Sequence, residues 1–113
     1  MKALVLETAD GPESVVVQEM ISPVPGEGEV RVDICAAALN HRELWISRGQ
    51  YGGMKLPCIL GADGAGIVSE VGAGVSTDLL GTEAVIYPGI DWGTDHRFPG
   101  RKFALLGMPY PGT

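Results

Sequence analysis

The sequence is 113 residues long, enough for one domain with a single hydrophobic core. Eight basic against fourteen acidic side chains leave a net charge of −6, so the chain offers no basic surface for nucleic acid or for an anionic membrane. Seventeen glycines and eight prolines, in a chain that is 45% hydrophobic, favour short strands joined by tight turns over a helical bundle. We therefore expect a folded, mainly β domain over residues 1–113.

The N-terminus and the cysteines indicate the compartment. After Lys2 the chain has only four consecutive apolar residues, too few for a signal peptide or a transmembrane helix. Cys35 and Cys58 lie in apolar stretches and do not form a Cys-x-x-Cys pair. We expect a cytoplasmic protein with two buried free thiols and no disulfide.

Several short segments have the residue pattern of strands. The predicted strands lie at residues 2–8, 14–20, 29–34, 67–71 and 83–87. Residues 29–34 alternate polar and apolar, which predicts that Val30, Val32 and Ile34 point inward. The small apolar residues 35–39 are expected to continue this strand into the interior. Residues 88–113 contain four prolines and five glycines without a period, so we expect a long surface loop there.

A helix start follows the apolar stretch. Asn40 and Glu43 have the spacing of a capping box, which predicts a helix from His41 to Arg48 that ends at Gly49. The i, i+3, i+4, i+7 spacing puts these residues on one side of the helix: His41, Leu44, Trp45 and Arg48. Arg42 and Glu43, together with Arg48, are expected on a solvated face.

Polar groups near this turn are the best candidates for chemistry. The Asn40 amide and the His41 imidazole can donate hydrogen bonds to a substrate carbonyl. Asn40 can equally be a helix cap and nothing more, and His41 can pack or face solvent. Trp45 and Tyr51 fit a pocket wall as well as a core, and Asp63 fits a turn as well as a site.

The residues give little support to a dinucleotide-binding site or to a zinc site. The glycines at 61, 64 and 66 have the wrong order of gaps for a dinucleotide fingerprint. They lead into a strand-like run, which offers no helix N-terminus to a pyrophosphate. The cysteines and histidines lack the short paired spacing of a zinc site, so we expect no metal.

The order of these features resembles the N-terminal, GroES-like catalytic domain of the medium-chain dehydrogenase/reductase superfamily. The stretches that carry the resemblance are residues 1–3, 25–30, 36–45, 60–66 and 71–72. In zinc-dependent members a cysteine occupies the position of Asn40, and a histidine-glutamate pair occupies the positions of Ala62 and Asp63. Residues 88–107 also lack the four cysteines of the family's structural zinc lobe. In these respects the chain resembles the zinc-free, quinone oxidoreductase-like branch.

The resemblance implies a fold and an activity. The fold is a partly closed antiparallel β-barrel with one or two short helices. The activity is zinc-independent, NAD(P)H-dependent reduction of a quinone, an enone or a small carbonyl. Asn40 and His41 would line the cleft for nicotinamide and substrate, with Trp45, Tyr51 and Asp63 around it. NADP or NAD would bind mostly outside this chain, because family members continue into a Rossmann domain. The parent enzyme would be a homodimer or homotetramer, and this chain alone would be inactive.

Two alternatives remain open. One is a zinc-containing alcohol dehydrogenase with atypical ligands, which metal analysis of the full-length protein would identify. The other is a stand-alone GroES-like binding domain without catalysis. An in-frame Rossmann segment after Thr113 in the gene would support the enzyme.

Overall fold

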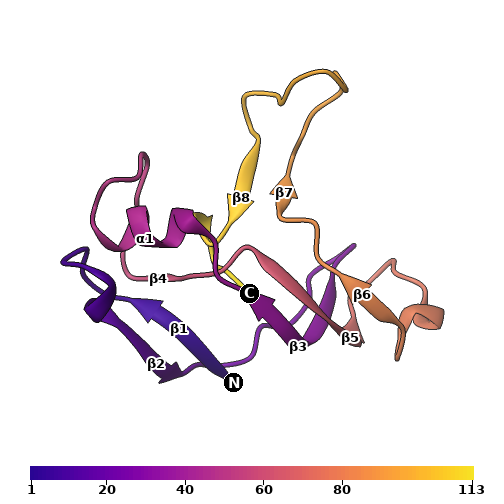
Figure 1. Ribbon diagram of the computed structural model, residues 1–113. Coiled ribbons are helices and arrows are strands. Elements are labelled where there is room, and N and C mark those ends of the chain that lie inside the picture. Colours follow the sequence, from indigo (N-terminus) through magenta and orange to yellow (C-terminus); the bar gives the residue numbers. More distant parts are fainter.

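The computed structural model describes residues 1–113 and is mainly β (Figure 1). The strands are β1 (Lys2–Leu6), β2 (Val15–Glu19), β3 (Val30–Ala38), β4 (Cys58–Ile59), β5 (Asp63–Val71), β6 (Glu83–Val85), β7 (Gly89–Ile90), β8 (Ala104–Leu106) and β9 (Pro109–Tyr110). The helices are α1 (His41–Ser47) and two 3-10 turns, η1 (Pro12–Ser14) and η2 (Thr77–Leu79). None of these helices has the length and apolar character that a membrane span requires.

The strands form three small sheets. Their orders are β2-β1-β4, β3-β5-β6 and β7-β8-β9, and every pair is antiparallel except β8 with β9. Figure 1 shows β1 and β2 on one side, β3, β5 and β6 on the other, and the β7–β8 arm projecting away from both. The predicted mainly β, GroES-like fold with one or two short helices is confirmed. The three sheets remain separate, and no closed barrel forms.

A small core joins α1 to the first sheet. The β1–β2 hairpin pairs from Lys2 opposite Glu19 to Leu6 opposite Val15. The β-branched valines of β2 favour its extended conformation. The buried apolar cluster consists of Leu6, Ile46, Leu60 and Met108. These four side chains come from β1, α1, the residue after β4 and the segment before β9. The core therefore fixes α1 against both the N-terminal and the C-terminal strands.

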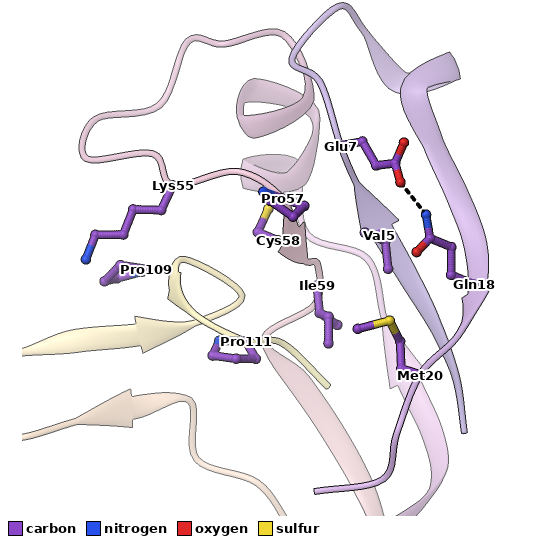
Figure 2. Close-up of a pocket in the computed structure, with 10 residues that line it drawn as sticks. All are labelled: Val5, Glu7, Gln18, Met20, Lys55, Pro57, Cys58, Ile59, Pro109 and Pro111. Atoms are coloured by element: carbon purple, nitrogen blue, oxygen red, sulfur yellow. Dashed lines mark hydrogen bonds between the residues drawn. The ribbon is translucent and has the colours of Figure 1, made fainter.

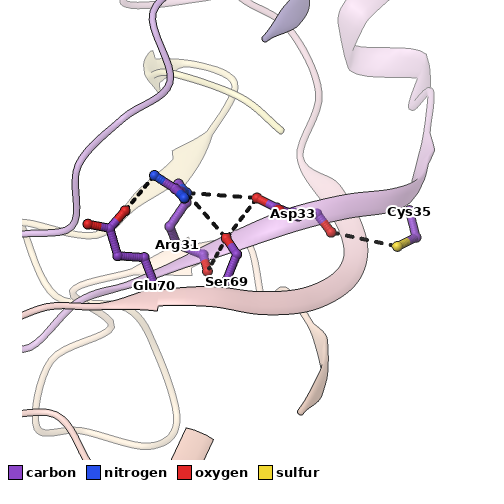
Figure 3. A network of polar contacts seen from close by, with 5 residues as sticks. All are labelled: Arg31, Asp33, Cys35, Ser69 and Glu70. Carbon is purple, nitrogen blue, oxygen red and sulfur yellow. Dashed lines mark hydrogen bonds and ion pairs between the residues drawn. The ribbon is translucent and has the colours of Figure 1, made fainter. Parts of the chain in front are cut away.

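The β3–β5 pair is the longest in the molecule, and it allows close backbone contact. A Cβ atom on Gly66 would overlap the carbonyl oxygen of Asp33 on the neighbouring strand. Polar side chains also cross this pair: Ser69 donates a hydrogen bond to the Asp33 carboxylate at 2.7 Å, and Arg31 forms an ion pair with Glu70 (Figure 3). These contacts hold the first half of the pair together. The register shifts between Arg31 and Val32 and again between Ile34 and Ala36, before Ala38 lies opposite Asp63.

The predicted burial of β3 is wrong except at Val32, which is half-buried. Val30 and Ile34 are 38% and 42% exposed, and residues 35–39 are exposed as well. The reason is that β3 is an edge strand, and Gly66 and Gly64 lie opposite Ile34 and Ala37 without side chains to cover them.

The two cysteines are free, but they differ from the prediction in burial. Cys35 on β3 is exposed, and its thiol lies 3.7 Å from the Asp33 carbonyl oxygen (Figure 3). Cys58 on β4 is half-buried, and this burial raises the pKa of its thiol. The prediction of buried thiols is therefore wrong for Cys35.

The prediction of a surface loop over residues 88–113 is also wrong in part. Gly89 and Ile90 pair with Leu105 and Ala104, and β9 then runs parallel to β8. The strands are very short and pair across a long connection, so the local sequence pattern does not reveal them. This segment returns the chain to the core, where Met108 is buried.

Candidate functional site

The turn from β3 into α1 is held by its backbone and by Glu43. Asn40 is the N-cap residue, with an extended conformation. Its backbone N–H donates to the Glu43 carboxylate at 2.6 Å, and the Glu43 N–H donates to the Asn40 carbonyl oxygen at 3.0 Å. Gly49, with a φ of 71°, ends the helix. The predicted helix start and terminating glycine are confirmed, and the Glu43 carboxylate binds the Asn40 N–H as the predicted capping box requires. The helix ends one residue earlier than predicted.

Asn40 and Asp63 form a side-chain pair beside this turn. The Asn40 Nδ2 atom donates to the Asp63 Oδ2 atom at 2.6 Å, and both residues are half-buried. The sheet creates this proximity, since Ala38 at the end of β3 lies opposite Asp63 at the start of β5. The Thr113 hydroxyl donates to the Asp63 backbone carbonyl at 3.0 Å. An amide has two N–H donors, so Asn40 retains one for another acceptor.

His41 and Trp45 lie together on the outer side of α1. Their rings stack with centroids 5.5 Å apart and an angle of 11° between planes. Trp45 is 43% exposed, and His41 and Arg48 are exposed. The predicted common side of the helix is thus its solvent side, and this exposed pair of rings offers a flat surface to a planar ligand.

Arg42 and Glu43 do not form the predicted solvated face. Their side chains are only 15% and 6% exposed. The Arg42 Nε atom lies 3.1 Å from Glu43 Oε1, its Nη2 atom donates to the Leu106 carbonyl oxygen, and its guanidinium carbon lies 5.6 Å from the centre of the Tyr51 ring. The Glu43 carboxylate and the Arg42 Nε and Nη2 atoms have hydrogen-bonding partners, which offset much of the cost of burying these charges. The sequence gives one indication of this burial, because a helix of two turns in a folded domain buries one of its sides. The buried side of α1 carries Ile46 and Ser47, and Glu43 lies on that same side.

The donor atoms near Asn40 do not suit zinc. The pair offers one amide and one carboxylate, and Ala62 has no donor atom. No group of three or more histidine, cysteine, aspartate or glutamate side chains is placed to hold a metal ion. A zinc site needs three or four convergent nitrogen, sulfur or carboxylate ligands.

A separate groove lies between the first sheet and the C-terminal strand (Figure 2). Its volume is about 300 Å³. The side chains that line it are Val5, Glu7, Gln18, Met20, Lys55, Pro57, Cys58, Ile59, Pro109 and Pro111. None of the five predicted site residues is among them. Of the five predicted site residues, Asn40 lies next to Asp63, and His41 lies next to Trp45. Tyr51 lies beside Arg42 instead.

Comparison with known proteins identifies the family. Residues 26–109 match the alcohol dehydrogenase GroES-like domain, and the chain belongs to this family. It is 36% identical over 94 residues to the zinc-type alcohol dehydrogenase-like protein YogA of Leptosphaeria maculans, covering 79% of this chain and 26% of that protein. The predicted place in the medium-chain dehydrogenase/reductase superfamily is confirmed.

Two solved structures show the same relationship. A crystal structure of an NAD-dependent alcohol dehydrogenase superposes with a TM-score of 0.89 at 39% identity, over 100% of this chain and 35% of that one. Escherichia coli quinone oxidoreductase complexed with NADPH superposes with a TM-score of 0.69 at 33% identity, over 75% of this chain and 26% of that one. The chain thus spans about a quarter to a third of the length of these relatives. The relatives are oxidoreductases, and this chain has the fold of their GroES-like domain.

Proposed function

We propose that the full-length protein is a zinc-independent, NAD(P)H-dependent oxidoreductase that reduces a quinone, an enone or a small carbonyl compound. Asn40 and His41 contact the substrate and the nicotinamide, and Trp45, Tyr51 and Asp63 surround them. The protein acts in the cytoplasm as a homodimer or homotetramer. The bound NADPH of the quinone oxidoreductase relative supports the choice of cofactor.

The observation that carries this proposal is the hydrogen bond from Asn40 Nδ2 to Asp63 Oδ2. The Asp63 carboxylate is an acceptor only, so it fixes which end of the Asn40 amide carries the donors. One N–H is then used by Asp63, and the other can donate to a substrate oxygen. A donor fixed in advance stabilises the negative charge that develops on that oxygen during reduction.

The chain's residues prepare the substrate for the reaction. Asn40 holds the carbonyl oxygen, and the stacked rings of His41 and Trp45 provide a planar surface beside it. Nicotinamide, when bound, supplies the hydride. Because hydride donation comes from the cofactor, this domain needs only to orient the acceptor and to stabilise the oxyanion.

The zinc-containing alternative has one observation in its favour, the zinc-type name of the Leptosphaeria maculans relative. The donor atoms weigh against it in this chain. A neutral amide is a poor zinc ligand compared with a thiolate, and the position next to Asp63 is occupied by Ala62. We therefore favour the zinc-independent reaction.

The test is steady-state NADPH oxidation by the full-length protein with quinones, enones and simple aldehydes. We expect Asn40→Ala to lower kcat/KM about tenfold or more, the cost of losing one fixed donor. The exposed Arg48→Ala, on the same helix, should remain within about twofold of wild type. Assays well below the melting temperature of each variant separate catalysis from the loss of the helix cap. An Asn40→Ala variant with wild-type kcat/KM would exclude Asn40 from the site.

A further inference from the structure

One guanidinium group connects three segments around the Asn40 turn. Arg42 belongs to α1, its Nη2 atom donates to the carbonyl oxygen of Leu106 on β8, and its guanidinium lies over the ring of Tyr51 in the loop that follows α1. Leu106 is 64 residues away in sequence. Arg42 is thus the point where the helix, the Tyr51 loop and the C-terminal segment meet.

A continuous series of hydrogen bonds links this group to Asn40. The Arg42 Nε atom donates to Glu43 Oε1 at 3.1 Å, and the other oxygen of the same carboxylate, Oε2, accepts the Asn40 backbone N–H at 2.6 Å. Arginine can hold Leu106 and Glu43 together because its donors form a rigid planar fork. The orientation of the Glu43 carboxylate, and with it the position of Asn40, therefore depends on Arg42.

The remaining donors of Arg42 argue against a role in stability alone. The Arg42 Nη1 atom is buried and has no hydrogen-bond partner. Such a group is costly, and each instance in a folded protein requires an explanation. An apolar side chain of similar length could fill this space without that cost. A guanidinium at this position is explained if its Nε and Nη2 atoms are needed to hold Glu43 and Leu106 in place.

We propose that Arg42 is a positioning residue for Asn40. It holds the Glu43 carboxylate in the orientation that fixes the start of α1, and it ties the Tyr51 loop to β8 in the same arrangement. Its effect on turnover rests on the proposed function, whereas its effect on the Asn40 turn does not. The two parts can therefore be tested separately.

The first test is hydrogen exchange of the full-length protein. The variants are Arg42→Met, which keeps the stem without the donors, and Arg42→Lys, whose single ammonium cannot replace the two-pronged contact. Arg48→Met on the same helix is the control. We expect amides of residues 40–44 to exchange about fivefold faster or more in both Arg42 variants, and amides of β1 to remain unchanged. Wild-type protection at residues 40–44 in a folded Arg42 variant would overturn the proposal. If Arg42→Met does not fold, Arg42→Lys decides.

The second test is a double-mutant cycle in turnover. If Arg42 acts through Asn40, Arg42→Met lowers kcat about fivefold or more in the wild-type background but has little further effect beside Asn40→Ala. The KM for NADPH should stay within about twofold of wild type. Additive effects on kcat would overturn the proposal. Faster exchange at residues 40–44 in the Arg42 variants, together with a wild-type protein that reduces no substrate, would support the positioning role and reject the proposed function.

Discussion

At the scale of single residues, the contact between Asn40 and Asp63 determines how the site responds to substitution. As a helix cap alone, Asn40 could be replaced by aspartate with little loss, since both residues cap well. The structure changes that expectation, because the Asp63 carboxylate lies 2.6 Å from the Asn40 amide nitrogen. An aspartate at position 40 would face a second carboxylate at hydrogen-bonding distance.

We therefore predict that Asn40→Asp lowers the free energy of unfolding at pH 7 by about 1–3 kcal/mol, the cost of a broken, partly buried hydrogen bond. Denaturant unfolding at pH 7 measures this. The exchanged pair, Asn40→Asp with Asp63→Asn, restores one amide and one carboxylate and should recover most of the loss. A single Asn40→Asp variant as stable as wild type at pH 7 would show that the pair does not form.

The two thiols should react at different rates. Burial raises the pKa of the Cys58 thiol, so less of it is thiolate at neutral pH, whereas Cys35 is exposed. Treatment of the 113-residue chain with iodoacetamide, followed by peptide mass spectrometry, should show Cys35 modified first. Because the Cys58 pKa is raised, its labelling should accelerate only as the pH increases. Faster labelling of Cys58 at neutral pH would mean that β4 does not protect it.

At the scale of elements, α1 shows what the sequence can and cannot predict. Its start, its capping box and its terminating glycine follow from local chemistry and were predictable. Which side of the helix is buried was not predictable, because both sides carry apolar and charged residues. Burial of Glu43 depends on Arg42, and Arg42 depends on the carbonyl of Leu106. That contact spans the chain and leaves no local pattern.

The sheets show the same division. The positions of β1, β2, β3 and β5 follow from alternation and β-branched residues, and the prediction placed them within a few residues. The exposure of Ile34 depends on the glycine opposite it on β5, which only the register reveals. The pairing of β7 with β8 depends on residues about fifteen positions apart, and neither strand is long enough to show a period. The exposure of Ile34 and the pairing of β7 with β8 therefore depend on strand pairing, which the local sequence pattern does not reveal.

Substitution of Gly66 tests the close approach of β5 to β3 at this position. Gly66→Ala should reduce stability by about 1–3 kcal/mol or more, because a methyl group there would overlap the Asp33 carbonyl oxygen. The matched control is Gly52→Ala, where nothing lies within 4 Å of the added carbon. That variant should stay within about 0.5 kcal/mol of wild type. Thermal melts of both variants measure these stabilities, and a Gly66→Ala variant as stable as wild type would contradict the pairing of β3 with β5.

At the scale of the whole molecule, the chain is open. Its accessible surface is 7502 Å², compared with roughly 6,000 Å² for a compact protein of this mass. Its radius of gyration is 14.9 Å, compared with about 13 Å for a compact domain of this length. Only 14 of 113 residues are buried, so strand pairing and one small core hold the fold together. The relatives are about three times as long as this chain, and the activity is proposed for the full-length protein.

We propose above that an oxidoreductase of this family works here through Asn40 and Asp63 without zinc. The most direct test measures zinc content and turnover on one preparation of the full-length protein, purified without chelator. We predict well below one zinc per chain, and NADPH-dependent reduction of a quinone or an enone that survives prolonged dialysis against a chelator. About one tightly bound zinc per chain, removed together with the activity and restored together with it, would contradict the claim.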